Sequence, residues 1–144
     1  MTLLTVALAA ILVLFGVNLI TRMSPTSSDG ANANSLTLDR ADVKGMAIEK
    51  EGKVFTLNQR QTESAVSFIN RMSPVDKNDY SKKGDFDFTK LMIYRFNKPD
   101  ITLVPIALER GNIVFDVPIL SSSSYMLERS GGEFSSLIQK ATEE

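Results

Sequence analysis

The sequence predicts an α+β protein: a single N-terminal transmembrane helix, then a small domain in which helices cover one face of an antiparallel β-sheet. Three observations lead to this prediction. An uncharged apolar run opens the chain, alternating apolar and polar residues dominate the later part, and two segments carry apolar residues at helical spacing. The predicted boundaries are an anchor at 1–22, a flexible linker at 23–36 and a soluble domain at 37–144, with the order β-β-α-β-β-β-α.

The first segment is long and apolar enough to span a membrane. Leu3 to Ile20 is apolar apart from Thr5, Gly16 and Asn18, and no charged side chain precedes Arg22. That length matches the ~20 residues that cross a hydrocarbon core of ~30 Å. Since no basic residue precedes the apolar run and no cleavage site closely follows it, we expect a retained signal-anchor rather than a cleaved signal peptide.

Three residues of the anchor are candidate membrane-helix contacts. Gly16 and Asn18 are the small and polar types that favour contacts between helices in lipid, and Arg22 can reach the membrane surface. Arg22 alone favours a cytoplasmic domain by the positive-inside rule. The tether "SPTSSDGANANS" favours the opposite side, and we expect a single-pass protein of the cell membrane with its domain outside the cytoplasm.

The opening residues Met1-Thr2-Leu3-Leu4 resemble the start of mature type IV pilins and secretion pseudopilins. That resemblance implies a filament subunit whose N-terminal apolar helix packs on its neighbours. The family has a glutamate at its fifth position, whereas this chain has Thr5.

The domain is predicted to begin with a hairpin and a helix. "VKGMAIEKEGKVFTL" indicates two strands around a Glu51-Gly52 turn, where glycine can supply a positive φ. In "NQRQTESAVSFINRM", Asn58 and Gln61 have the spacing of a helix capping box. The expected buried residues of these elements are Met46, Ile48, Phe55, Leu57, Ala65, Val66, Ile69 and Met72.

The stretches "VNLITRMSP" and "VSFINRMSP" share six of nine residues, but their flanks differ. In each, an arginine can complement the C-terminal carbonyls of a helix, and the residue before proline is pushed out of the α region. We therefore predict two similar helix ends and no internal repeat.

The second half is predicted to be mostly sheet. After a polar loop over "SPVDKNDYSKKGD", the strands are "FDFTKLMIYRF", "ITLVPIALE" and "IVFDVP". The residues expected on the buried face of the first are Phe86, Phe88, Met92, Tyr94 and Phe96. Because proline cannot donate to a ladder, we expect the second strand at an edge or a bulge.

An open edge would let a partner add a strand, so Thr102, Val104 and Pro105 are candidate partner contacts. In the tail we predict a short helix over Tyr125 to Arg129, a break at Gly131-Gly132, and a helix over "EFSSLIQKA".

The composition narrows the chemistry. The chain has no cysteine and no histidine, which removes disulfides, thiolate nucleophiles and the usual zinc and haem ligands. With 16 Lys and Arg against 17 Asp and Glu, no basic field exists to hold nucleic acid. The serines at 121–124 have no neighbouring base. We therefore predict no catalytic, metal-binding or cofactor-binding residues.

These observations favour a non-catalytic, membrane-anchored protein-binding domain, an accessory or assembly subunit of a larger membrane protein complex. Its expected partners are other subunits of that complex and, through residues 3–20, membrane lipid. Two alternatives remain: a pilin-like filament subunit, and a tethered domain that binds a small molecule or lipid in a pocket between helix and sheet.

Overall fold

The computed structural model describes residues 35–81, 83–120 and 123–143. The predicted anchor, with Gly16, Asn18 and Arg22, lies outside these residues. Within them, no helix is both long enough and apolar enough to cross a membrane.

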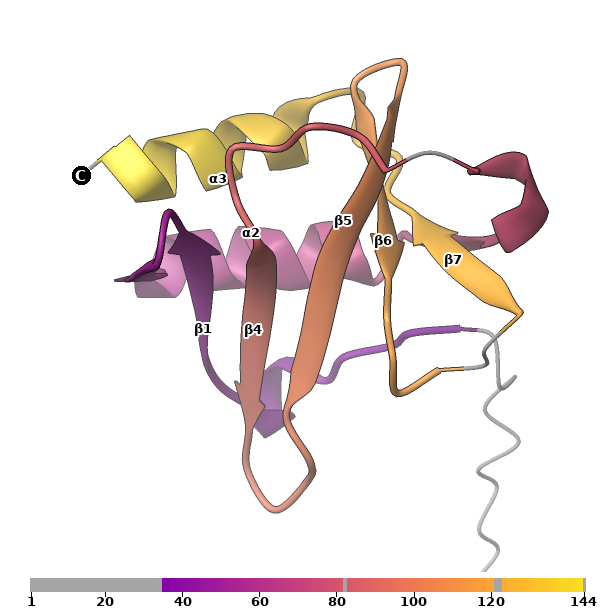
Figure 1. The fold of residues 1–144 in the computed structure, drawn as a ribbon. Helices are drawn as coiled ribbons and strands as arrows, with labels where there is room; N and C mark the ends of the chain where they lie inside the picture. Colours follow the sequence, from indigo (N-terminus) through magenta and orange to yellow (C-terminus); the bar gives the residue numbers. More distant parts are fainter. Residues whose placement is uncertain (1–34, 82, 121–122, 144) are drawn as a thin grey trace, which may run out of the picture. The chain divides into compact units, whose positions relative to one another are not determined.

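Seven strands form one antiparallel sheet in the order β2-β1-β4-β5-β6-β7-β3 (Figure 1). Two helices accompany them, so the α+β class is confirmed. The strands are β1 Val43–Lys50, β2 Lys53–Thr56, β3 Ser73–Asp76, β4 Lys90–Arg95, β5 Ile101–Glu109, β6 Asn112–Asp116 and β7 Ser124–Leu127. The helices are α2 Gln59–Ile69 and α3 Glu133–Glu143, with 3-10 turns η1 at Arg40–Asp42 and η2 at Lys77–Asp79.

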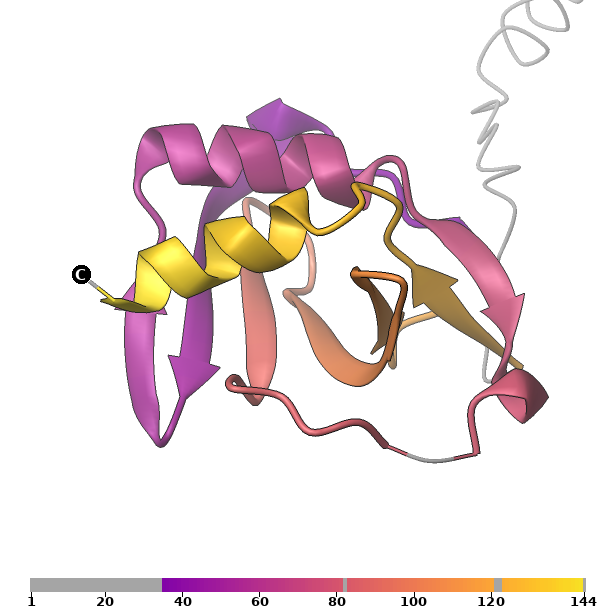
Figure 2. The same ribbon diagram turned by 90° about the horizontal axis from the view of Figure 1, so that it is seen from above.

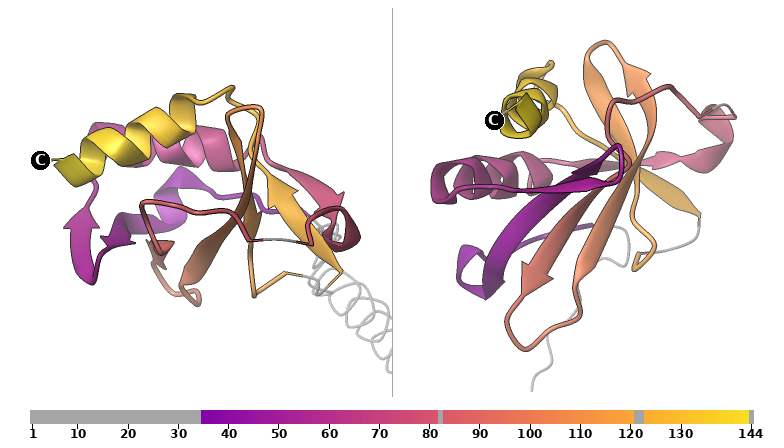
Figure 3. Two further views of the ribbon diagram at one scale, coloured as in Figure 1. Left: turned by 45° about the horizontal axis from the view of Figure 1, so that its top comes forward. Right: turned by 60° about the vertical axis from the view of Figure 1, so that its left-hand side comes forward.

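Both helices pack on the same face of the sheet, and the core lies between them and the strands (Figure 2). Figure 3 shows the layers from two further directions, with α2 and α3 side by side. Inward-facing residues of the central strands are almost fully buried there, together with residues of both helices. They include Met46, Ile48, Leu91, Ile93, Ile101, Leu103, Ala65, Ile69, Phe134 and Ile138.

The predicted hairpin is confirmed. β1 and β2 pair from Lys50↔Lys53 onward, and the two residues between them have positive φ angles, 52° at Glu51 and 77° at Gly52. This is the backbone of a type I′ turn, whose twist matches that of the strands it joins.

The capping box of α2 is also confirmed. The Asn58 side chain accepts a hydrogen bond from the Gln61 backbone N–H, and the Gln61 side chain accepts one from the Asn58 N–H. At the other end, Arg71 Nε donates to the Ser67 carbonyl at 3.2 Å, and Ser73 opens β3. The arginine thus serves the helix end as predicted.

The sheet has seven strands where five were predicted, and the two additional strands are β3 and β7. β3 lies where a polar loop was predicted, and β7 replaces the predicted helix over Tyr125 to Arg129. Each pairs with the other through Ser73↔Leu127 to Asp76↔Ser124. The partners lie about 50 residues apart in the chain, so this pairing depends on tertiary structure rather than on local pattern.

Of the residues predicted on the buried face of this strand, Phe88 is buried and Phe86 packs partly buried against the core, but the prediction was wrong within β4 itself. Leu91 and Ile93 face the core, while Met92 is half-buried and Tyr94 is exposed on the opposite face. Phe96 follows the strand and is exposed. Both faces of β4 carry apolar residues, so alternation alone could not choose between them.

The predicted edge position of β5 was also wrong. β5 is an interior strand that pairs with β4 at Thr102↔Met92 and with β6 at Val104↔Asp116 and Pro105↔Phe115. The alternative expectation of a bulge is confirmed, because the register with β6 shifts between Pro105 and Ala107. Strand addition at Thr102, Val104 and Pro105 therefore has no open ladder to use.

Candidate functional site

The face of the sheet opposite the helices carries an apolar surface over the neighbouring strands β2, β1, β4 and β5. We call it the outer face. In Figure 1, α2 passes behind β1, β4 and β5, so this face is turned toward the viewer. From the strand registers it consists of Gly45, Ala47, Glu49, Val54, Thr56, Lys90, Met92, Tyr94, Thr102 and Val104.

Charge on the outer face is confined to one pair. Lys90 Nζ lies 3.0 Å from Glu49 Oε2, and the two residues are directly opposite each other in the β1–β4 ladder. Opposite charges at such a position stabilise strand pairing and neutralise each other. The other eight residues of the outer face are uncharged.

Several apolar side chains of the outer face reach solvent. Val54 is 58% exposed and Tyr94 36% exposed, and Met92 and Val104 are half-buried. An antiparallel sheet with helices on one face usually has polar side chains on the other. An apolar face in that position is typical of a surface that another protein covers.

The remaining half of the same sheet face is already covered by the chain itself. Lys77 Nζ lies 3.4 Å from Asp116 Oδ1 and 4.7 Å from the centre of the Tyr125 ring. The rings of Tyr80 and Tyr125 lie 6.4 Å apart. The turn η2 and Tyr80 therefore lie over β6 and β7, and the open surface is limited to the outer face.

A hollow of about 560 Å³ lies at one end of the outer face. Its lining residues are Lys44, Gly45, Thr56, Tyr94, Arg95 and Asp100. A Cβ at Gly45 would meet no atom within 4 Å. Asp100 Oδ1 accepts a hydrogen bond from the Arg95 backbone N–H.

Further hollows lie on the helix side of the sheet. An open groove of about 620 Å³ separates α2 from α3, with Phe68 and Leu137 among its lining residues. A smaller one of about 190 Å³ lies between α3 and the 85–88 segment, lined in part by Phe86, Ile113 and Ile138. It is smaller than the roughly 300–1,000 Å³ of most ligand pockets.

The described residues hold no group of three or more acidic side chains, histidines or cysteines that could bind a metal ion. A hydrogen bond to the Glu109 carboxylate raises the pKa of Tyr80 to about 12. Glu128 is buried, and its Oε1 accepts a hydrogen bond from the Ser130 N–H. Its Oε2 has no hydrogen-bond partner among the described residues.

The sequence-predicted contacts of β5 are divided by the strand alternation. Thr102 and Val104 present their side chains on the outer face, whereas Pro105 is buried on the core side. Val54, Thr56, Met92 and Tyr94 were not predicted as surface contacts. The apolar character of both faces of β4 was a signal for Met92 and Tyr94, whereas nothing comparable marked Val54 and Thr56 of β2.

Comparison with models of protein families, with curated proteins and with solved structures found no match for this chain. Any functional conclusion therefore rests on the surfaces described above.

Proposed function

We propose that this protein is a non-catalytic, membrane-anchored protein-binding domain that serves as an accessory or assembly subunit of a larger membrane protein complex. In this proposal, residues 3–20 form the anchor and the outer face contacts another subunit. The observation that carries the proposal is the apolar outer face, on which the charged residues are the paired Glu49 and Lys90.

The physical basis is desolvation. Covering apolar surface is favourable by roughly 25 cal/mol per Å², and an ion pair already formed adds no unmatched charge to the interface. Tyr94 and Met92 are residue types enriched in protein interfaces. A partner that brings its own apolar surface can therefore bind without an enclosed pocket.

The test is affinity capture of the full chain from its native membrane in mild detergent, with the co-purifying proteins identified. We expect wild type to retain membrane subunits and the double variant Met92→Lys/Val104→Lys to lose them, because two charges would be buried without partners. The matched control is Leu108→Lys, since Leu108 is 61% exposed but lies at the β5–β6 tip, outside the outer face. Recovery of wild type alone, or identical partners for both variants, would contradict the proposal.

The small-molecule alternative has one supporting observation, the hollow between α3 and the 85–88 segment. Its volume of about 190 Å³ favours protein binding over this alternative.

A further inference from the structure

β2 is an edge strand with open backbone groups. It stands at one end of the strand order, and Figure 2 shows no other described strand beyond it. Among the described strands it pairs with β1 alone, through four residue pairs from Lys50↔Lys53 to Ala47↔Thr56.

The phase of the hairpin identifies which groups are open. In a two-residue type I′ hairpin the residues flanking the turn, Lys50 and Lys53, form a hydrogen-bonded pair, and such pairs then alternate along the ladder. The Leu57 N–H donates to the Met46 carbonyl at 2.9 Å, which fits this alternation. The N–H and C=O of Val54 and Thr56 therefore point away from β1.

The two open residues are also accessible. Val54 is 58% exposed and Thr56 is exposed, and both side chains lie on the outer face. The opposite edge of the sheet is protected better, because β3 contains Pro74, which has no N–H to donate. β2 is thus the edge that can accept another strand.

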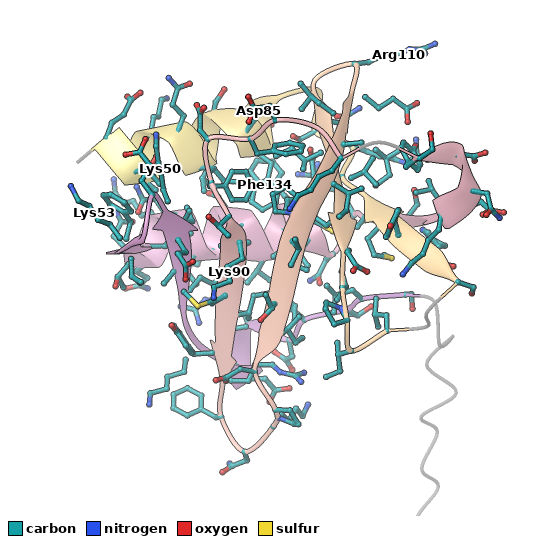
Figure 4. The ribbon with its side chains drawn as sticks, in the orientation of Figure 1. Lys50, Lys53, Asp85, Lys90, Arg110 and Phe134 are labelled. Atoms are coloured by element: carbon teal, nitrogen blue, oxygen red, sulfur yellow. The ribbon has the colours of Figure 1, made fainter. Side chains whose placement is uncertain are left out.

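Two cations flank this edge. Lys77, Lys90 and Lys98 each form an ion pair with an acidic residue, but Lys44 and Lys53 are exposed and have no ion-pair partner among the described residues. Figure 4 shows Lys53 directed outward at the edge of the domain.

Lys44 lines the hollow beside Thr56, at the other end of β2. Given the Ala47↔Thr56 register, Lys44 and Lys53 lie about six residues, or roughly 20 Å, apart along the strand direction.

We propose that an extended segment of the partner protein adds to β2 as an eighth strand, with an acidic residue near each end and apolar side chains between them. Its backbone bonds Val54 and Thr56, and its apolar side chains extend the outer face. One acidic residue meets Lys44 beside the outer face, and the other meets Lys53, which the Lys50↔Lys53 register places on the helix side of the sheet. This inference rests on the proposed function and specifies how the partner binds.

The test uses the purified full chain and a fluorescent synthetic peptide of about eight residues, with alternating valine and threonine between two terminal glutamates. This length places the two glutamates on opposite faces of the strand, one on the side of Lys44 and one on the side of Lys53. Fluorescence anisotropy measures its affinity. N-methylation of alternate backbone amides, those along the edge that pairs with β2, removes donors and keeps every side chain. We expect that change to weaken binding at least about tenfold.

The electrostatic part is tested by charge reversal. Replacing both glutamates of the peptide with lysines should weaken binding to wild type, and the variant Lys44→Glu/Lys53→Glu should bind the lysine peptide better than the glutamate peptide. In the chain, Val54→Pro removes one open N–H and should weaken binding, whereas Thr56→Val keeps both N–H groups and should not. Circular dichroism verifies that each variant is folded.

The inference is overturned if the peptide does not bind, or if the N-methylated peptide binds as tightly as the parent. It is equally overturned if the chain forms dimers that Val54→Pro abolishes, since β2 would then pair with a second copy. If membrane capture requires Met92 and Val104 but is unchanged in Val54→Pro, the strand-addition inference fails while the proposed function stands.

Discussion

Gly111 and Gly45 differ in the conformation that each requires. Gly111 lies in the turn between β5 and β6 with a φ of 84°, and a Cβ there would be 3.6 Å from backbone atoms of Gly131. Gly45 lies in β1 without a positive φ, and a Cβ there would meet nothing within 4 Å. The first position requires glycine for its backbone conformation, and the second does not.

We therefore expect Gly111→Ala to lower the free energy of unfolding by about 1–2 kcal/mol, because an L-residue in the left-handed region is strained. Gly45→Ala is the matched control and should change it by less than about 0.5 kcal/mol. Urea denaturation of both variants and wild type measures the difference. Equal stability of the two variants would show that the turn does not need its positive φ.

At the scale of elements, one side chain attaches the start of the described chain to the end of α2. Asn70 Oδ1 accepts a hydrogen bond from the Leu38 N–H at 2.7 Å, and Asn70 Nδ2 donates to the Leu38 carbonyl at 2.9 Å. Leu36 and Leu38 are buried in the core. The amide side chain thus acts as a strand partner for a segment that belongs to no sheet.

Replacing Asn70 with alanine removes both hydrogen bonds, so the N–H and the carbonyl of Leu38 lose their protein partner. We expect Asn70→Ala to lower the free energy of unfolding by about 1–3 kcal/mol. Hydrogen exchange at the Leu38 amide should accelerate more than exchange at core amides such as that of Ile93. Unchanged protection of the Leu38 amide would show that the Asn70 hydrogen bonds do not hold this segment. Asn70→Asp keeps only the acceptor, and its loss of stability should lie between those of wild type and Asn70→Ala.

The elements that depend on local chemistry were predictable from the sequence. The capping box at Asn58 and the type I′ turn at Gly52 each require only neighbouring residues. The short strands β3 and β7 pair with each other across a long sequence separation, so local pattern did not predict them. β4 has apolar residues on both faces, so local pattern did not predict which face is buried. Because both faces of β4 are apolar, the sequence predicted Met92 and Tyr94 to be buried in the core, and the outer face was therefore not predicted.

At the scale of the whole molecule, aromatic rings connect the sheet to both helices. The Phe134 ring of α3 lies 5.4 Å from Phe68 of α2 and 5.9 Å from Phe115 of β6, and Phe115 in turn lies 6.3 Å from Phe88. Figure 4 shows Phe134 between the helices and the sheet. One side chain therefore joins the packing of three elements.

We expect Phe134→Ala to lower the free energy of unfolding by about 3–5 kcal/mol, because it leaves a cavity where two helices and the sheet meet. Phe96→Ala is the control of equal chemistry: Phe96 is 50% exposed, and its loss should cost less than about 0.5 kcal/mol. Thermal unfolding followed by near- and far-ultraviolet circular dichroism measures both. If Phe134→Ala melts in two steps, with the sheet outlasting the helices, then the helices and the sheet do not fold as one cooperative unit.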